Sequence, residues 1–184
     1  MRKLASALGV EAMSLYNHVA GKDDVLDGLT GLFLARIEIP PPTGDWRTDL
    51  RALAAALRSA ARRQPQAASL ALTREAISEQ GLAVTAAALE ALGHAGFSYE
   101  EAVDAQRATT ALLAGALLRE LRASAAGSAV GPEAAAERES VLLASGLEPI
   151  VDAATQLAHL DFDREYDYSV ELMLDALEAR AASA

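Results

Sequence analysis

Apolar residues recur at intervals of three and four along most of the sequence, and this spacing constrains the fold more than any other feature. Val25, Leu29, Leu32, Phe33 and Ile37, for example, would all lie on one side of a single helix. Alanine runs through nearly every segment, and aromatic residues make up only 4% of the chain. No segment alternates convincingly between apolar and polar residues, as a half-buried strand would. The sequence therefore predicts an all-α protein.

The clearest break in the chain is the run PPPTG at residues 40–44, because three consecutive prolines cannot continue a helix. The run separates a region of short helices, residues 1–37, from a longer helical region, residues 45–184. The sequence therefore predicts two regions of unequal size.

Three residues of the longer region are expected to begin helices as N-terminal caps. Asp45 and Thr73 each precede an apolar-periodic run, and Ser98 forms a capping-box pattern with Glu101. The helices expected in this region cover residues 46–64, 73–92, 98–123, a short stretch from Pro132, 148–160 and 163–182, with a loop at 124–131.

The distribution of charge suggests two separate tasks. A formal net charge of −10 at pH 7 argues against a general affinity for nucleic acid. The first 22 residues differ, since Arg2, Lys3 and Lys22 stand against a single acid, Glu11, which gives them a net charge of +2. A small basic region on an acidic body indicates that the two regions bind different partners.

Composition also limits the compartment and the kinds of site. The chain has no cysteine, so it can form neither a disulfide framework nor a thiolate metal site. No segment approaches the about 18 uninterrupted apolar residues of a membrane span, and the N-terminus lacks a signal-peptide pattern. We therefore expect a cytoplasmic protein with no membrane partner.

The stretch LASALGVEAMSLYNHV, residues 4–19, has the sequence shape of a helix-turn-helix. Ala5 is small enough for two helices to touch, Gly9 suits a bend, and Leu15 can fill the shared core. Many helical hairpins share this spacing, so the pattern alone does not establish DNA binding.

The polar content of the second helix adds to this pattern. With Leu15 turned inward, Ser14, Asn17 and His18 point outward and Tyr16 lies at the edge. Hydroxyl and amide groups of this kind bond to base edges or phosphates. Lys22, at the start of the next helix, is placed for a phosphate. The alternative is an ordinary solvated helix with capping residues.

These residues resemble the helix-turn-helix of the tetracycline-repressor (TetR) family. The family pattern runs through a small-residue helix, an LGV turn, an LY-x-H recognition helix and a K-x-x-L opening of the connecting helix. The closing segment FDREYDYSVELMLDALEAR is similar to the last helix of the subgroup closest to the tetracycline repressors. The matching positions within residues 1–37 are Leu4, Ala5, Leu8, Gly9, Val10, Leu15, Tyr16, His18, Val19, Lys22 and Leu26.

The resemblance implies a homodimeric repressor that leaves its operator when a small-molecule inducer enters the C-terminal core. Residues 1–37 would be the DNA-binding region, and residues 45–184 the ligand-binding and dimerisation domain. In this family Tyr16 and His18 would hold phosphates, so base discrimination would depend mainly on Ser14, Asn17, Glu11 and Ala12, and Lys22 would contact the backbone. The two recognition helices of a dimer would enter successive major grooves about 34–36 Å apart.

The sequence departs from the family at its N-terminus. The family has a further helix before the position of Met1, and that helix helps cover the apolar face of Leu4, Leu8, Leu15 and Val19. We expect a misplaced start codon or a shortened chain. The alternative function is then an N-terminally truncated, dimeric small-molecule-binding module that does not bind DNA as it stands.

The inducer site is expected among the helices of residues 50–121 and 148–160. The candidates are polar residues within apolar helical runs. Each has a simpler explanation, because a helical threonine can bond to its own backbone and a lone histidine is usually solvated. The candidates are His94, Gln106, Thr109, Thr110, Gln156 and His159, with Thr109 and Thr110 favoured by their apolar neighbours.

The dimer is expected to form through the helices of residues 98–123 and 163–182. Residues 108–118 are nearly apolar all round, and Leu172 lies off the main apolar stripe of the last helix. A four-helix interface across a two-fold axis would cover both surfaces. The alternative is that the helix of residues 98–123 is covered on both sides by other helices of its own chain.

Enzymatic function finds little support in the sequence. Gly28 and Gly31 lie within a helical pattern and not in a phosphate loop between a strand and a helix. No Ser/His/Asp order stands out, and the three histidines lie in separate segments. We expect no catalytic residue, no metal and no cofactor, and a detectable turnover would favour an all-α hydrolase or lyase instead.

Overall fold

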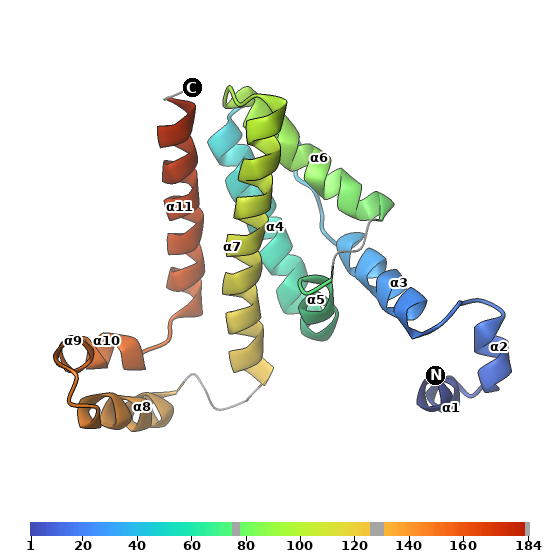
Figure 1. Ribbon diagram of the computed structural model, residues 1–184, viewed down its shortest axis with the longest axis horizontal. Coiled ribbons are helices and arrows are strands. Elements are labelled where there is room, and N and C mark those ends of the chain that lie inside the picture. The colour runs from blue at the N-terminus through green and yellow to red at the C-terminus, as the bar shows by residue number, and fades with distance from the viewer. Residues whose placement is uncertain (75–77, 126–130, 183–184) are drawn as a thin grey trace. The chain divides into compact units, whose positions relative to one another are not determined.

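The computed structural model describes residues 1–74, 78–125 and 131–182, and every regular element within these ranges is an α-helix (Figure 1). The all-α prediction is therefore confirmed. The contacts within the chain divide it into two compact units, Met1–His94 and Ala95–Ala184.

The first unit is built around a core to which α3 to α6 contribute. α3 packs against α5 and α6, and α4 packs against the same two helices. Phe33 from α3, Leu50 from α4 and Leu92 from α6 are all buried. The first two helices pack against each other (Figure 1). The helices of this unit are α1 (Arg2–Leu8), α2 (Ala12–Tyr16), α3 (Lys22–Leu34), α4 (Trp46–Arg63), α5 (Pro65–Ala71) and α6 (Glu79–His94).

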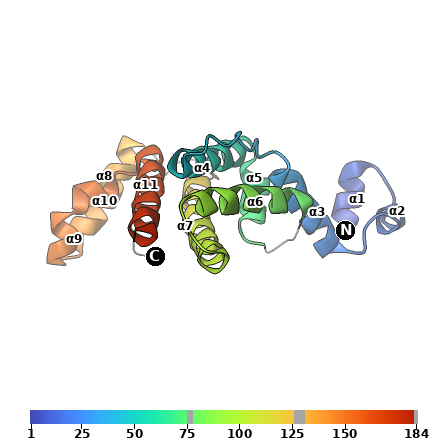
Figure 2. The ribbon, with the colours of Figure 1, turned by 90° about the horizontal axis from the view of Figure 1, so that it is seen from above.

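The second unit contains two long antiparallel helices, α7 and α11, which lie side by side (Figures 1 and 2). Both helices carry buried leucines, with Leu113, Leu117 and Leu121 on α7 and Leu174 and Leu177 on α11, and the α11 residues belong to the apolar stripe expected from the sequence. The shorter helices α8 and α10 pack against each other. The helices of this unit are α7 (Tyr99–Ala125), α8 (Pro132–Ala144), α9 (Glu148–Asp152), α10 (Ala154–Ala158) and α11 (Phe162–Ala181).

Two of the three expected N-terminal caps are confirmed. The Asp45 carboxylate accepts a hydrogen bond from the Thr48 amide at 3.1 Å. At the start of α7, the Ser98 amide donates to Glu101 Oε2 at 3.1 Å, and the Glu101 amide donates to Ser98 Oγ at 3.4 Å. These reciprocal bonds are those of a capping box, and they satisfy amides that the helix itself leaves unpaired.

The proline-rich break is fastened to the helix that follows it. The Thr43 amide and hydroxyl both donate to Asp49 Oδ1, at 2.8 and 2.7 Å. These two bonds hold the pKa of Asp49 below its ordinary value, because they stabilise the ionised carboxylate. The residues before α4 are thereby held to the first turns of that helix.

The expectation that Thr73 begins a helix is wrong. Its hydroxyl donates backward to the carbonyls of Ser69 and Leu70, at 3.0 and 2.9 Å, so it closes the end of α5. The next helix begins at Glu79, where Ser78 Oγ accepts the Gly81 amide at 3.1 Å. Residues 75–77, part of the expected helix, lie outside the described residues.

Other helix boundaries also differ from the sequence expectation. Pro65 starts α5, because a proline at the first helical position lacks only an amide that would have no helical partner. The single helix expected at 148–160 is two, since the backbone at Ala153 (φ −101°, ψ 7°) leaves the helical region. The loop expected at 124–131 begins later, because α7 continues through Ala125, and residues 126–130 lie outside the described residues.

Candidate DNA-binding site

The turn between α1 and α2 has the geometry that the sequence predicts. Gly9 follows α1 with φ 68° and ψ 27°, the left-handed conformation that glycine adopts without strain. The Val10 amide donates to the Ala5 carbonyl at 3.0 Å, so the turn is closed by the end of α1 itself. Ala5, the small residue expected between the two helices, is buried.

The second helix of the pair is shorter than expected. It ends at Tyr16, and the next residues form a turn in which the amides of His18 and Val19 donate to the Leu15 carbonyl, both at 3.0 Å. Asn17 and His18 therefore project from this turn. The His18 bond spans three residues and the Val19 bond four, and bonds of the first kind commonly tighten the end of a helix.

The side chains of this segment divide as the sequence predicts. Leu15 is half-buried. Ser14, Asn17 and His18 are exposed, and Tyr16 is 49% exposed. A row of hydroxyl, amide and imidazole groups therefore lies free on one short surface, where it can donate to and accept from an external ligand.

Lys22 is the first residue of α3 and is exposed. The turn before it is fixed by the Asp24 carboxylate, which accepts the Ala20 amide at 2.9 Å. The positions that the sequence assigns to DNA contact, from Ser14 to Lys22, are thus held in one short segment.

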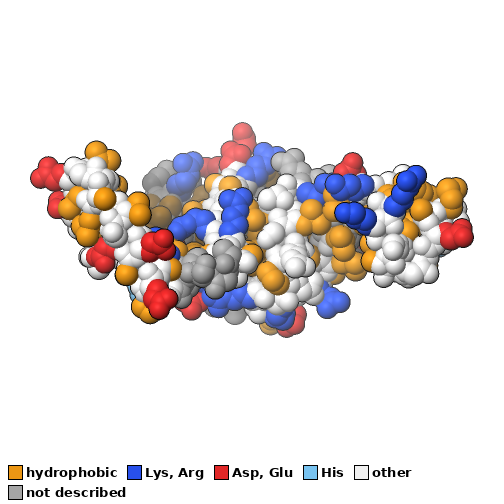
Figure 3. Space-filling model, turned by 90° about the horizontal axis from the view of Figure 1, so that it is seen from below, with side chains coloured by type: hydrophobic (Ala, Val, Ile, Leu, Met, Phe, Trp, Pro, Cys, Tyr) orange, Lys and Arg blue, Asp and Glu red, His pale blue; other side chains and the backbone are white. Residues whose placement is uncertain are grey.

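The surface around α1 and α2 carries both basic and hydrophobic side chains. Figure 3 shows blue and orange side chains next to one another at its right-hand end, where these helices lie. Leu8 is 59% exposed and Met13 is 70% exposed. Apolar residues this exposed are expected to find a cover, because monomeric proteins seldom leave large apolar patches in water.

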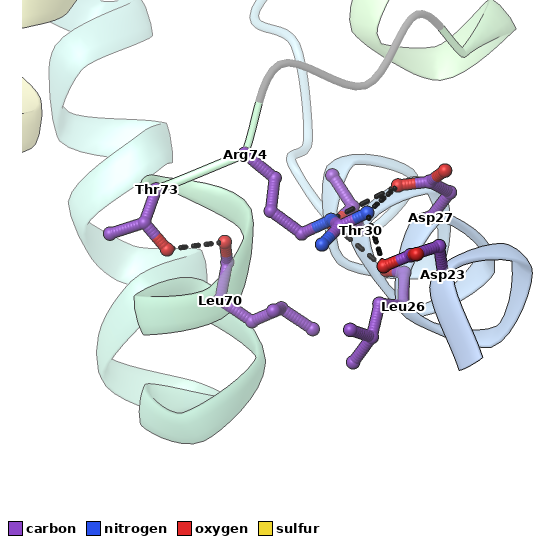
Figure 4. Close-up of polar contacts among 7 residues, drawn as sticks. All are labelled: Asp23, Leu26, Asp27, Thr30, Leu70, Thr73 and Arg74. Atoms are coloured by element: carbon purple, nitrogen blue, oxygen red, sulfur yellow. Dashed lines mark hydrogen bonds and ion pairs between the residues drawn. The ribbon is translucent and has the colours of Figure 1, made fainter.

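Hydrogen bonds also join Asp27 of α3 to Arg74, a residue that the sequence did not mark as functional. Arg74, between α5 and α6, donates from Nε and Nη2 to Asp27 Oδ1, at 3.0 and 2.7 Å (Figure 4). Its Nη2 also lies 3.6 Å from Asp23 Oδ1. The hydrogen bonds to Asp27 raise the pKa of Arg74. No local pattern marks this contact, because Arg74 and Asp27 are 47 residues apart.

The expected inducer-binding residues come from several elements. Gln106 and Thr110 are brought together on α7, where Gln106 Nε2 donates to Thr110 Oγ1 at 3.0 Å. Thr109 is half-buried on the same helix. The other three are exposed and lie at the end of α6, in α10 and directly after α10: His94, Gln156 and His159.

Residues 1–74, 78–125 and 131–182 also bear on membrane crossing and metal binding. No helix in these ranges is long and apolar enough to cross a membrane. No three His, Asp or Glu side chains in the same ranges are grouped so that they could hold a metal ion.

Comparison with protein families and curated relatives agrees with this geometry. The family described as "Tetracyclin repressor-like, C-terminal domain" matches residues 40–181. A helix-turn-helix (HTH) type transcriptional regulator of Saccharopolyspora erythraea is 37% identical over 121 residues, which are 65% of this chain and 51% of the relative. The chain therefore spans about half the length of that relative. An HTH-type transcriptional repressor of Mycobacterium tuberculosis is 28% identical over 185 residues, covering 95% of this chain and 70% of the relative.

Solved structures show the same fold. The Streptomyces coelicolor TetR family protein ActR, in complex with actinorhodin, superposes with a TM-score of 0.84 at 24% identity. The match covers 98% of this chain and 87% of ActR. The arrangement of helices in this chain is therefore that of the TetR-family fold, a helix-turn-helix followed by a larger helical region.

Proposed function

Because this chain belongs to the tetracycline-repressor (TetR) family of transcriptional regulators, we propose that it is a ligand-responsive repressor. A homodimer binds operator DNA through residues 1–37, and a small-molecule inducer bound within residues 45–184 releases it. The protein works as a regulator and not as an enzyme. It acts in the cytoplasm, where bacterial operator DNA is found.

The observation that carries the proposal is the exposed polar row after the Gly9 turn. Ser14 and Asn17 are free to bond to base edges, and Tyr16 and His18 are free to hold phosphates. Lys22, exposed at the start of α3, is placed to neutralise a further phosphate. We assign these five residues to DNA contact, with base discrimination mainly from Ser14 and Asn17.

The second faces of α7 and α11 support the proposed dimer. Leu113 and Leu174 bury one face of each helix, but Leu112 remains partly exposed, and Tyr168 and Leu172 are largely exposed. Two copies that brought these faces together would form a four-helix interface and remove the apolar surface from water. We therefore propose that the dimer forms through residues 98–123 and 163–182.

The inducer is proposed to bind among the helices of the C-terminal region. ActR, which shares the fold, has been solved with actinorhodin, so actinorhodin is a suitable first probe. The polar candidates are His94, Gln106, Thr109, Thr110, Gln156 and His159. Gln106 and Thr110 are already bonded to each other, so a ligand that uses them must exchange that bond for its own.

Equilibrium binding to DNA tests the proposal. The probe is a labelled duplex of about 30 base pairs, long enough for two half-sites, selected from a random library by the wild-type protein. Affinity should fall steeply between about 50 and 200 mM salt, because phosphate contacts release counterions. Tyr16→Ala and Lys22→Ala should weaken binding to all duplexes, whereas Asn17→Ala should reduce discrimination between selected and random duplexes.

The control is Ser140→Ala, an exposed residue of α8 that should leave binding unchanged. Equal losses of affinity and discrimination in the Tyr16, Lys22 and Asn17 variants would contradict the separate roles. Absence of salt-dependent binding by the wild-type protein would contradict the repressor function itself.

One observation favours a second candidate function. The exposed Leu8 and Met13 leave α1 and α2 without an apolar cover, as expected for a ligand-binding module that does not engage DNA. That protein would form dimers and bind a small molecule such as actinorhodin, yet show no salt-dependent DNA binding. The same titration therefore separates the two candidates.

A further inference from the structure

The DNA-facing end of α3 carries an excess of acid. Residues 1–27 contain three basic side chains, Arg2, Lys3 and Lys22, against four acidic ones. Three of those acids lie in the first two turns of α3 next to Lys22: Asp23, Asp24 and Asp27. Carboxylates at this place would repel the phosphates that Lys22 is proposed to hold. A DNA-binding surface with this charge needs a further source of positive charge.

The structure gives each of these carboxylates a partner. Asp24 accepts the Ala20 amide, which fixes the turn before α3. Asp27 receives two hydrogen bonds from the Arg74 guanidinium, and Asp23 lies 3.6 Å from the same group (Figure 4). Asp23 and Asp27 are four residues apart, so they share one face of the helix, and Arg74 lies against that face. One cation therefore serves two carboxylates.

We propose that Arg74, from outside the helix-turn-helix, is a determinant of DNA affinity because its positive charge offsets part of the negative charge of Asp23 and Asp27 next to Lys22. This inference rests on the proposed function, since it concerns the charge that α3 presents to DNA. It adds to the DNA-binding machinery a residue that lies beyond Pro40, within the region that otherwise matches the C-terminal domain of the family.

The exposure of the three side chains indicates an electrostatic task more than a stabilising one. Arg74 is 26% exposed, whereas Asp23 is 87% exposed. Ion pairs with such exposed partners contribute little to folding free energy, because water screens them and side-chain entropy opposes them. Their effect on an approaching polyanion is larger, since DNA phosphates respond to the summed charge of the surface.

Two other roles for Arg74 give different results in a double-mutant cycle. If Arg74 acts only as a mechanical link between α5 and α3, Asp27→Asn breaks that link and weakens binding. If Arg74 itself contacts a phosphate, Asp27→Asn cannot compensate for its loss. Neutralisation predicts that Asp27→Asn binds at least as tightly as the wild type and compensates for the loss of Arg74.

The experiment measures binding of the full chain to the selected duplex across the same salt range. Arg74→Gln should weaken binding about fivefold at low salt, because two carboxylates then face the phosphates. Arg74→Gln combined with Asp27→Asn should return to within about twofold of the wild type, since it restores the local net charge. Arg74→Lys should lose little affinity for the duplex, because lysine keeps the positive charge although it lacks the planar guanidinium group.

Arg63→Gln is the matched control. Arg63 bonds to the Arg36 carbonyl at 3.3 Å and lies 3.9 Å from Glu38, just beyond the opposite end of α3. That end is about 20 Å from Lys22 along a helix of 13 residues. This variant removes the same charge from the whole protein, so its binding should match the wild type within about twofold.

Several results would overturn the inference. A double variant as weak as Arg74→Gln, or a weakened Asp27→Asn, would show a mechanical or direct role instead. If the wild type binds the duplex and Arg74→Gln binds it equally well, this inference alone is overturned. No binding by the wild type would overturn the proposed function and this inference together. Circular dichroism confirms folding, and if Arg74→Gln fails to fold, Asp27→Asn and Arg74→Lys decide the question.

Discussion

The helix pair α1–α2 and the helix pair α7–α11 are built in opposite ways. The helices of the first pair have 7 and 5 residues, neither has a side-chain cap, and Ala5 is the one buried residue that they contribute. The helices of the second pair have 27 and 20 residues, and each begins at a side-chain cap, Ser98 in one and Asp161 in the other. Both pairs follow from helical periodicity, but only the second contains a core of its own.

This difference separates recognition from stability. Helices shorter than about 12 residues are marginal in water, so α1 and α2 depend on packing for their stability. The α7–α11 pair buries two apolar stripes and still has an apolar second face. The exposed polar row from Ser14 to Lys22 therefore lies where the chain is least able to hold its own structure.

The largest effect should come from the core between α7 and α11. Leu174→Ala removes a fully buried side chain and should lower the free energy of unfolding by about 3 kcal/mol, through lost burial and the cavity left behind. Leu143→Ala, on the exposed side of α8, is the matched control and should cost about 0.5 kcal/mol. Chemical denaturation measures both. Equal losses would mean that the long pair has no core of its own.

The second face of the long pair should control assembly. Leu172, 53% exposed on α11, is replaced by aspartate, which places a charge in the proposed dimer interface. We expect the molecular mass measured by sedimentation equilibrium to fall from about twice the chain mass of 19.2 kDa to the mass of a single chain. Leu143→Asp should leave the dimer intact. A dimer that survives Leu172→Asp would place the interface elsewhere.

The turn of the short pair should respond to a smaller change. Gly9→Ala forces a side chain into a left-handed backbone and should cost about 1 kcal/mol in this turn. Affinity for DNA should then fall about fivefold, because the binding-competent turn is less populated. Gly28→Ala, within α3 and also free of steric contact, should leave affinity unchanged or raise it. Equal effects of the two substitutions would remove the special role of the Gly9 turn.

The smallest expected effect concerns the capping box of α7. Hydrogen bonds from Ser98 hold the pKa of Glu101 below its ordinary value. Because the folded pKa is the lower one, this contribution is present above the unfolded pKa and is lost as the pH falls through the folded pKa. Between about pH 6 and about pH 3, the melting temperature should fall more in the wild type than in Glu101→Gln. Equal falls would mean that the box adds no stability.

Local sequence predicted the parts of the fold that depend on local physics. The buried stripe of α11, the Ser98 capping box and the Gly9 turn all follow from spacing and residue type. The expectation for Thr73 fails because its hydroxyl can bond forward to an amide at a helix start or backward to a carbonyl at a helix end. The sequence contains both options, and the structure has the second.

The candidate site was predictable only where it is continuous in the chain. Ser14 to Lys22 form one segment whose exposed side follows from Leu15 being half-buried. Arg74 reaches Asp27 across 47 residues and through a connection whose course is set by tertiary packing. No periodicity or motif at Arg74 indicates that contact. The expected inducer residues remain predictions, and the structure joins two of them, Gln106 and Thr110, by a hydrogen bond.

Hydrogen–deuterium exchange, measured with and without the selected duplex, tests most directly whether the α1–α2 pair, which contains no core of its own, is the region that binds DNA. In the free protein we expect the amides of α1 and α2 to exchange much faster than those of α7 and α11. Added duplex should slow exchange from Ser14 to Lys22 and leave the centres of α7 and α11 unchanged. Protection that appears elsewhere, or no protection from Ser14 to Lys22 when the duplex is bound, would contradict the assignment of DNA recognition to this segment.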